Sequence, residues 1–96
     1  MLTEQQAAIV KGLLARGEKQ HDIAAFFGVN GGRIADIAKA RKYPEVKPAA
    51  KKDLPTPAQL TGTFAVHQAR QAILRAKLGL EAALSFLDEQ EANRDG

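Results

Sequence analysis

The run of twenty residues from Gln20 to Lys39 constrains the fold most, because it predicts two short helices joined by a tight turn. Ala24 is small where the two helices must cross, and Gly28 follows four residues later. The turn there needs a positive φ, which glycine adopts without steric cost. Apolar residues recur at the inward positions, namely Ile23, Phe27, Val29, Ile34 and Ile37. Together these features predict a helix-turn-helix, whose second helix is shaped to enter a DNA major groove.

A helix before this run, over about residues 3–16, would complete a three-helix bundle. Thr3 and Gln6 have the spacing of a capping box at its start, and Gly17 is suited to end it. The next two helices are expected over about residues 20–27 and 30–40, with Asn30 as the N-cap of the third. The expected core comprises Ile9, Val10, Leu13, Leu14, Ile23, Ala24, Phe26 or Phe27, Val29, Ile34 and Ile37.

The segment after the predicted bundle, residues 41–57, contains all four prolines and shows no helical apolar period. It also carries several lysines around Tyr43. We interpret it as an extended, partly polyproline linker, or as a basic arm that lies along DNA. The expected division is a helix-turn-helix domain over residues 1–42, an extended basic linker over 43–62 and a helical dimerisation region over 63–96.

The last third of the chain predicts one long amphipathic helix from residue 64 to about residue 92. Apolar residues recur there with alternating gaps of three and four, a heptad pattern formed by Val66, Ala69, Ile73, Ala76, Leu80, Ala83 and Leu87. Such a stripe must be buried somewhere, and the proline- and lysine-rich segment argues against tight folding back. We therefore expect a homodimer through this helix, with contacts from Val66, Ile73, Leu80, Leu84 and Leu87. Gly79 leaves a helical hairpin open as the alternative within this all-α fold.

Charge is distributed unevenly along the chain. Residues 1–52 hold ten Lys and Arg against five acids, a net charge of +5, and residues 53–96 hold four bases against six acids, a net charge of −2. The positive excess therefore coincides with the predicted helix-turn-helix and the segment after it. This coincidence favours a phosphate-binding surface in the first half of the chain. The alternative is a solvated protein surface whose charges have no binding role.

The Gln20–Lys39 run resembles the helix-turn-helix of phage repressors, and it is also similar to the trihelical DNA-binding domains of serine recombinases. The resemblance covers about a fifth of the chain. It implies that the second helix of the pair reads bases through its exposed positions. In this chain those positions are Asn30, Gly31, Gly32, Ala35, Asp36 and Lys39, with Arg33 beside them and Gln20 where these families often contact phosphate.

The chemistry of these residues allows more than one role for each. Arg33 suits a bidentate contact to guanine or a phosphate contact, and Asn30 suits adenine or only a helix cap. Asp36 can accept a hydrogen bond from cytosine or pair with Arg33 or Lys39 on its own helix. The two glycines lack reading side chains but let the backbone approach closely. The expected DNA-binding set is Gln20, Asn30, Gly31, Gly32, Arg33, Asp36, Lys39, Arg41 and Lys42.

Other classes of function find little support in the sequence. The chain has no cysteine, which excludes disulfides and thiolate metal sites, and its two histidines lack partners at metal-ligand spacing. No residue pattern identifies a nucleophile or an acid–base pair. We therefore expect no enzyme activity, metal or cofactor. No apolar run of about 18 residues exists, so we expect no membrane association.

Taken together, the sequence predicts a sequence-specific transcriptional regulator that binds double-stranded DNA as a dimer. Its expected place is the cytoplasm, on the nucleoid, in a bacterial or phage setting. The alternatives are a protein-interaction adaptor and a non-specific nucleoid or RNA-binding protein. The target sequence and the choice between repression and activation stay open.

Overall fold

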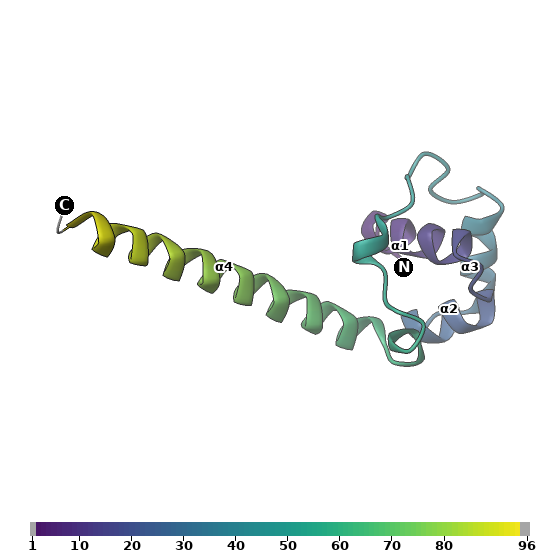
Figure 1. Ribbon diagram of the computed structural model, residues 1–96. Coiled ribbons are helices and arrows are strands. Elements are labelled where there is room, and N and C mark those ends of the chain that lie inside the picture. Colours follow the sequence, from purple (N-terminus) through teal and green to yellow (C-terminus); the bar gives the residue numbers. More distant parts are fainter. Residues whose placement is uncertain (1, 95–96) are drawn as a thin grey trace. The chain divides into compact units, whose positions relative to one another are not determined.

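The computed structural model describes residues 2–94, with side chains described as far as residue 91, and this part of the chain is all-helical. The chain divides into two compact units, Met1–Phe64 and Ala65–Gly96. The first unit contains three helices and two short 3₁₀ turns, and the second is made by one long helix (Figure 1). In chain order the elements are α1 (Glu4–Ala15), α2 (Gln20–Phe27), α3 (Gly31–Ala38), η1 (Lys51–Asp53), η2 (Gln59–Thr61) and α4 (Phe64–Arg94).

Two of the first three helices begin with the caps expected from the sequence. At α1 the capping box is complete, because the Thr3 hydroxyl accepts from the Gln6 amide and the Gln6 side chain accepts from the Thr3 amide. At α3 the Asn30 side chain accepts from the Gly32 amide at 2.8 Å. Each bond satisfies a backbone donor that the helix itself leaves without an acceptor. These local signals therefore fix where α1 and α3 start, and α3 ends two residues before the expected boundary.

The ends of α2 and α3 share one backbone arrangement. After α2, Gly28 has φ of 67°, and the Val29 amide donates to the Ala24 carbonyl at 3.0 Å. After α3, Ala40 has φ of 59°, and the Arg41 amide donates back to the Asp36 carbonyl at 2.8 Å. Both are Schellman-type ends, which favour glycine at the left-handed position. Ala40 holds that conformation at a cost of about 1–2 kcal/mol.

Most of the expected core is buried in the first unit, including Leu13, Ile23 and Ile34. Of the two alternatives in α2, Phe26 is the buried ring, while Phe27 is half-buried and meets it edge to face at 5.1 Å. The expected core residues Leu14 and Val29 are also only partly buried. The core gains residues that helical periodicity did not identify, namely Leu2, Ala7 and Leu60.

Residues 43–62, called the returning segment from here on, pack against α1 instead of forming an extended linker. The Ala49 amide donates to the Ala8 carbonyl at 2.8 Å. The Lys11 ammonium, on α1, donates to the backbone carbonyls of Tyr43 and Val46. These bonds join positions more than thirty residues apart, so no local pattern in the sequence could reveal them.

The later part of the returning segment completes the same core. The Arg16 guanidinium donates to the Pro55 carbonyl at 2.7 Å. The Leu54 methyl groups lie so close to Gly12 that a side chain there would have its first carbon 2.7 Å from one of them. Leu60 follows as a buried core residue. The structure therefore divides the chain after residue 64, whereas the sequence favoured boundaries at residues 42 and 62.

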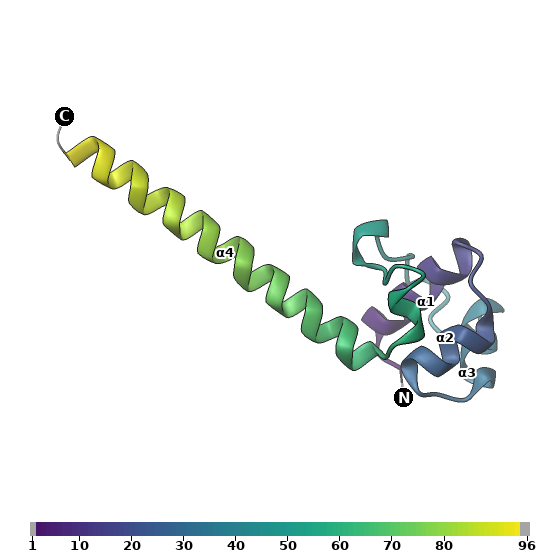
Figure 2. The same ribbon diagram turned by 60° about the horizontal axis from the view of Figure 1, so that its bottom comes forward.

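The second unit is one uninterrupted helix in its described part. α4 runs from Phe64 to Arg94 with no break at Gly79, so the helical hairpin kept open from the sequence is wrong (Figures 1 and 2). A glycine inside a helix costs only about 1 kcal/mol, which a run of good helix formers tolerates. Large apolar side chains remain exposed along α4, among them Ile73 at 70% and Leu80 at 66%.

Candidate nucleic-acid interface

One side of α3 is packed and the other is open. Ile34 and Ile37 point into the core of the first unit, where they are buried. The residues of the first turn, Gly31, Gly32 and Arg33, are all exposed. Nothing lies within 4 Å of the place that a Gly31 side chain would occupy. The start of α3 is therefore accessible to a macromolecule, which is a geometric requirement for a helix that enters a groove.

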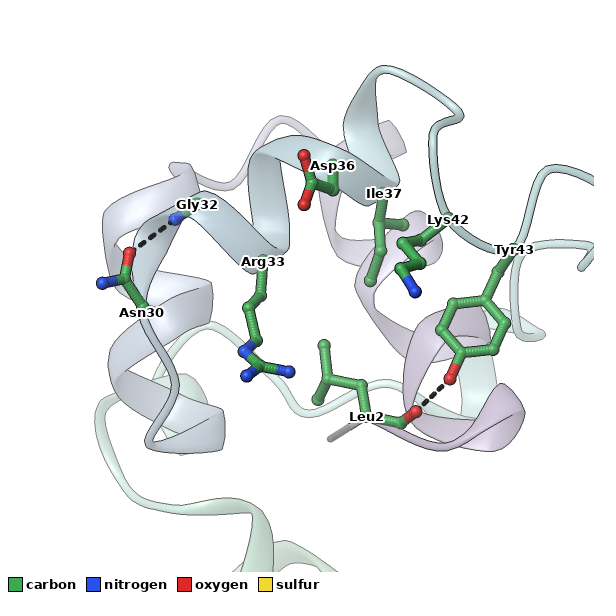
Figure 3. A pocket seen from close by; sticks show the side chains of 8 residues that line it. All are labelled: Leu2, Asn30, Gly32, Arg33, Asp36, Ile37, Lys42 and Tyr43. Atoms are coloured by element: carbon green, nitrogen blue, oxygen red, sulfur yellow. Dashed lines mark hydrogen bonds between the residues drawn. The ribbon is translucent and has the colours of Figure 1, made fainter.

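A hollow of about 560 Å³ opens beside this exposed turn, and we call it the α3 hollow. The side chains of Arg33 and Lys42 extend into it (Figure 3). Tyr43 and Leu2 lie on its far side, joined by a hydrogen bond from the tyrosine hydroxyl to the leucine carbonyl. The lining is Leu2, Asn30, Gly32, Arg33, Asp36, Ile37, Lys42 and Tyr43. The α3 hollow thus combines two cationic side chains with an aromatic ring and aliphatic walls.

The charges around α3 are only partly neutralised by the protein itself. Among the described residues, Arg33, Lys39 and Lys42 have no ion pair. Arg41 lies 3.5 Å from the Asp36 carboxylate, with both side chains substantially exposed. The pair is worth at most about 1 kcal/mol at such exposure, so a phosphate could compete for the arginine. The surface therefore keeps three uncommitted cations and one weakly committed one.

The ion-pair partner of Asp36 is not one of those considered from the sequence. The sequence left two roles open for Asp36, a contact to cytosine and an ion pair with Arg33 or Lys39, which lie at short helical spacing from it. The structure pairs Asp36 with Arg41 instead. The cause is the left-handed Ala40, which turns the chain back so that the Arg41 amide already donates to the Asp36 carbonyl. The guanidinium is consequently brought near the carboxylate of the same residue.

The structure brings together most of the expected DNA-binding set around α3. Asn30, Gly32, Arg33, Asp36 and Lys42 all line the α3 hollow. The remaining members, Gln20, Gly31, Lys39 and Arg41, are exposed but do not line it. Sequence reasoning missed Leu2 and the lining role of Tyr43, because they reach the site through a contact between residues 41 positions apart.

The expected dimerisation residues lie on α4 in the second unit. Val66, Ile73, Leu80, Leu84 and Leu87 are each at least half exposed. Leu74, Leu78 and Phe86 are exposed in the same way, so the apolar surface is broader than the predicted seam. Ile73, Leu80, Leu84 and Leu87, which lie further along α4, are each more than half exposed in a single chain.

Two further findings concern other kinds of site. Within residues 2–94, no group of three or more His, Cys, Asp and Glu side chains could hold a metal ion. No helix in the same part of the chain combines the length and the apolar character that crossing a bilayer requires.

Compared with models of protein families, with curated proteins and with solved structures, the chain has no significant match.

Proposed function

We propose that the protein binds double-stranded DNA through α3 as a helix-turn-helix protein and acts as a homodimeric transcriptional regulator. The observation that carries this proposal is the open first turn of α3, with Arg33 and Lys42 beside it and no internal ion pair for either among the described residues. The corresponding place of action is the nucleoid in the cytoplasm.

Electrostatics supports phosphate binding at this surface. A helix N-terminus carries backbone N–H groups and a partial positive charge, which favour an anion. Arg33 and Lys42 add full charges at the same place, and Lys39 adds another at the end of α3. Gly31 and Gly32 leave the backbone bare, so a phosphate or a base edge can approach it closely. Affinity in this arrangement comes largely from the attraction between these charges and phosphates, which does not depend on the DNA sequence.

Sequence preference would come from the few side chains that extend from the exposed side of α3. Arg33 has the geometry for a bidentate contact to guanine, which is worth about 1–3 kcal/mol of discrimination. The side-chain oxygen of Asn30 already accepts the capping hydrogen bond of α3, so its NH₂ group is the part that remains available to a base. We therefore propose that Arg33 is the main reader and that the other cations contact the backbone.

The first experiment measures binding to DNA duplexes by fluorescence anisotropy at several salt concentrations. We expect the logarithm of the binding constant to fall with the logarithm of salt concentration, with a slope of about −0.9 for each phosphate neutralised. A slope near zero on every duplex would rule out the proposal. Single-stranded RNA serves as the competitor, and equal competition by RNA would favour a non-specific nucleic-acid binder instead.

The second experiment compares matched variants on a preferred duplex, found by selection from a random pool, and on unrelated duplexes. Arg33→Ala should lower affinity for the preferred duplex more than for the others. Lys39→Ala and Lys42→Ala, which remove the neighbouring cations of α3, should weaken binding evenly across sequences. Arg75→Ala removes the same charge from α4 and should leave binding nearly unchanged. If Arg33→Ala instead lowers the affinity for all duplexes equally, Arg33 contacts phosphate and does not read a base.

A protein-interaction adaptor is the second candidate, and the broad apolar surface of α4 is the observation that favours it. A chain that stays monomeric and shows no salt-dependent DNA binding would favour the adaptor. Light scattering with and without random-sequence DNA distinguishes the two, because the regulator is dimeric alone and gains mass with DNA.

A further inference from the structure

The charged residues of α4 are sorted by sign along its length. Residues 64–80 contain Arg70, Arg75 and Lys77 and no acid. Residues 81–94 contain four acids, Glu81, Asp88, Glu89 and Glu91, against the single base Arg94. The first half of the helix therefore has a net charge of +3 and the second half −3.

This order is unfavourable for an isolated helix. The helix macrodipole favours acidic side chains near the N-terminus and basic side chains near the C-terminus. In α4 the first turn has no acid, and acids gather near the other end. The helix therefore gains no stability on its own from this order of charges. A second helix that runs in the opposite direction presents the complementary order.

The sorted charges also lie beside the apolar stripe. The heptad position that flanks the stripe on one side holds Arg70 and Lys77 in the first half and Leu84 and Glu91 in the second, and the acids Glu81 and Asp88 lie at the next position outward on the same side. The heptad positions that flank the stripe on its other side are uncharged, namely Ala65, Ala72, Gly79 and Phe86. The two edges of the stripe are thus different, and they determine which orientation of a second copy would suit α4.

We propose that two copies of α4 pair antiparallel through the exposed apolar stripe, which rests on and refines the proposed dimer. In an antiparallel pair, a two-fold axis perpendicular to the helices brings the same edge of both copies together. The basic half of each edge then meets the acidic half of the other. In a parallel pair the charged edge meets the uncharged edge, so the sorted charges gain nothing.

The side chains of the stripe are compatible with close pairing. Large apolar residues at Val66, Ile73, Leu80 and Leu87 alternate with alanines at 69, 76 and 83, and all of them are exposed. Small residues at a contact allow two helices to approach to about 8 Å between axes. The antiparallel pair buries these apolar groups and also opposes the two helix dipoles. It joins two first units to opposite ends of one rod.

The experiment labels the full chain with a nitroxide at one introduced cysteine, since the chain has no cysteine of its own. The matched variants are Ala82→Cys, near the middle of the helix, and Gln68→Cys, nearer its start, which are both exposed and share a heptad position away from the stripe. With 1.5 Å per residue, an antiparallel pair centred near the middle of the stripe offsets the two labels at position 68 by roughly 25–35 Å along the axis, and those at position 82 by only about 10–15 Å. Pulsed electron spin resonance measures both distances, and the distance at position 68 should be clearly the longer. Equal distances at the two positions would overturn the proposal and indicate a parallel pair.

Charge reversal gives an independent measurement. Arg70→Glu combined with Lys77→Glu makes the charged edge wholly acidic, so the dimer should weaken at least tenfold by light scattering. Arg75→Glu is the control, because its position lies away from that edge, and it should leave the mass unchanged. Dimer strength should also fall as salt is raised, since exposed charges are screened. An unchanged dimer in the double variant would contradict antiparallel pairing.

The outcomes separate this inference from the proposed function. A monomeric wild-type chain contradicts both the dimer and its orientation. A dimer with parallel distances leaves the proposed function intact and overturns the orientation alone. An antiparallel dimer without salt-dependent DNA binding supports the orientation and overturns the proposed function.

Discussion

Replacement of Leu60 by alanine is the sharpest test of the first unit, because it removes a core residue from the segment that the sequence identified as a linker. Leu60 is only 6% exposed and belongs to the same apolar cluster as Leu13 and Ile23. Buried Leu→Ala changes cost about 2–5 kcal/mol, partly because a cavity remains. A unit of this size has a total stability of about 3–5 kcal/mol. Leu60→Ala should therefore remove most of the free energy of unfolding of the first unit.

Tyrosine fluorescence during urea unfolding measures this effect for the first unit alone. Tyr43 is the single tyrosine of the chain, which has no tryptophan, and it is hydrogen-bonded to Leu2 within that unit. With a urea dependence of about 1 kcal/mol per molar, a loss of about 2–3 kcal/mol lowers the midpoint by about 2–3 M or leaves the unit unfolded without urea. Circular dichroism is less suitable, because α4 contributes helical signal of its own.

Leu78→Ala is the matched control, since it deletes the same atoms from an exposed position in α4. Its effect on the tyrosine transition should stay within about 0.5 kcal/mol. If Leu60→Ala also shifts the transition by no more than that, the returning segment does not stabilise the bundle, and the reasoning from its buried contacts is refuted.

Three further substitutions test individual contacts by the same unfolding measurement. Ala40→Gly should stabilise the first unit by about 0.5–1 kcal/mol, because relief of the left-handed strain outweighs the added freedom of the unfolded chain; a loss of stability would contradict the strain. Gly12→Ala should destabilise by about 1 kcal/mol despite the better helix propensity of alanine, because the new methyl group must displace Leu54 and would also lie 3.3 Å from the Ala49 carbonyl oxygen, on backbone that is bonded to α1; a gain would mean that both neighbours move aside freely. Lys11→Met should cost about 1–2 kcal/mol, because it removes the donor of the Val46 carbonyl and leaves the Tyr43 carbonyl with the Val46 amide alone. An unchanged midpoint there would mean that water replaces the ammonium without loss.

Local signals in the sequence were sufficient for the helices and for the turn between α2 and α3. Thr3 and Asn30 are recognisable caps because each bonds a backbone group only two or three residues away. Gly28 marks the left-handed turn for a similarly local reason. The apolar period identified the inward faces, although Phe26 and Phe27 could be separated only in the packed unit.

The candidate site was predictable in its residues but not in its arrangement. Arg33 and Lys42 are visible as cations near the second helix of the pair, yet their extension into a shared hollow depends on Tyr43 and Leu2. The pairing of Asp36 with Arg41 depends on the turn at Ala40, where alanine gives no sequence signal for a left-handed residue. These features depend on where the chain turns back on itself, and helix-forming patterns do not specify that.

The sequence by itself determined the four α-helices of this protein, because caps, turn glycines and apolar periodicity act within one or two helical turns. Only the tertiary structure decided that residues 43–62 belong to the first unit. The lysine of α1 bonds carbonyls more than thirty residues away, and Leu60 enters a core whose other members precede it by over twenty residues. Backbone carbonyls and a single leucine have no period that a sequence pattern could display. Their positions follow from packing, which is fixed only when all the helices are together.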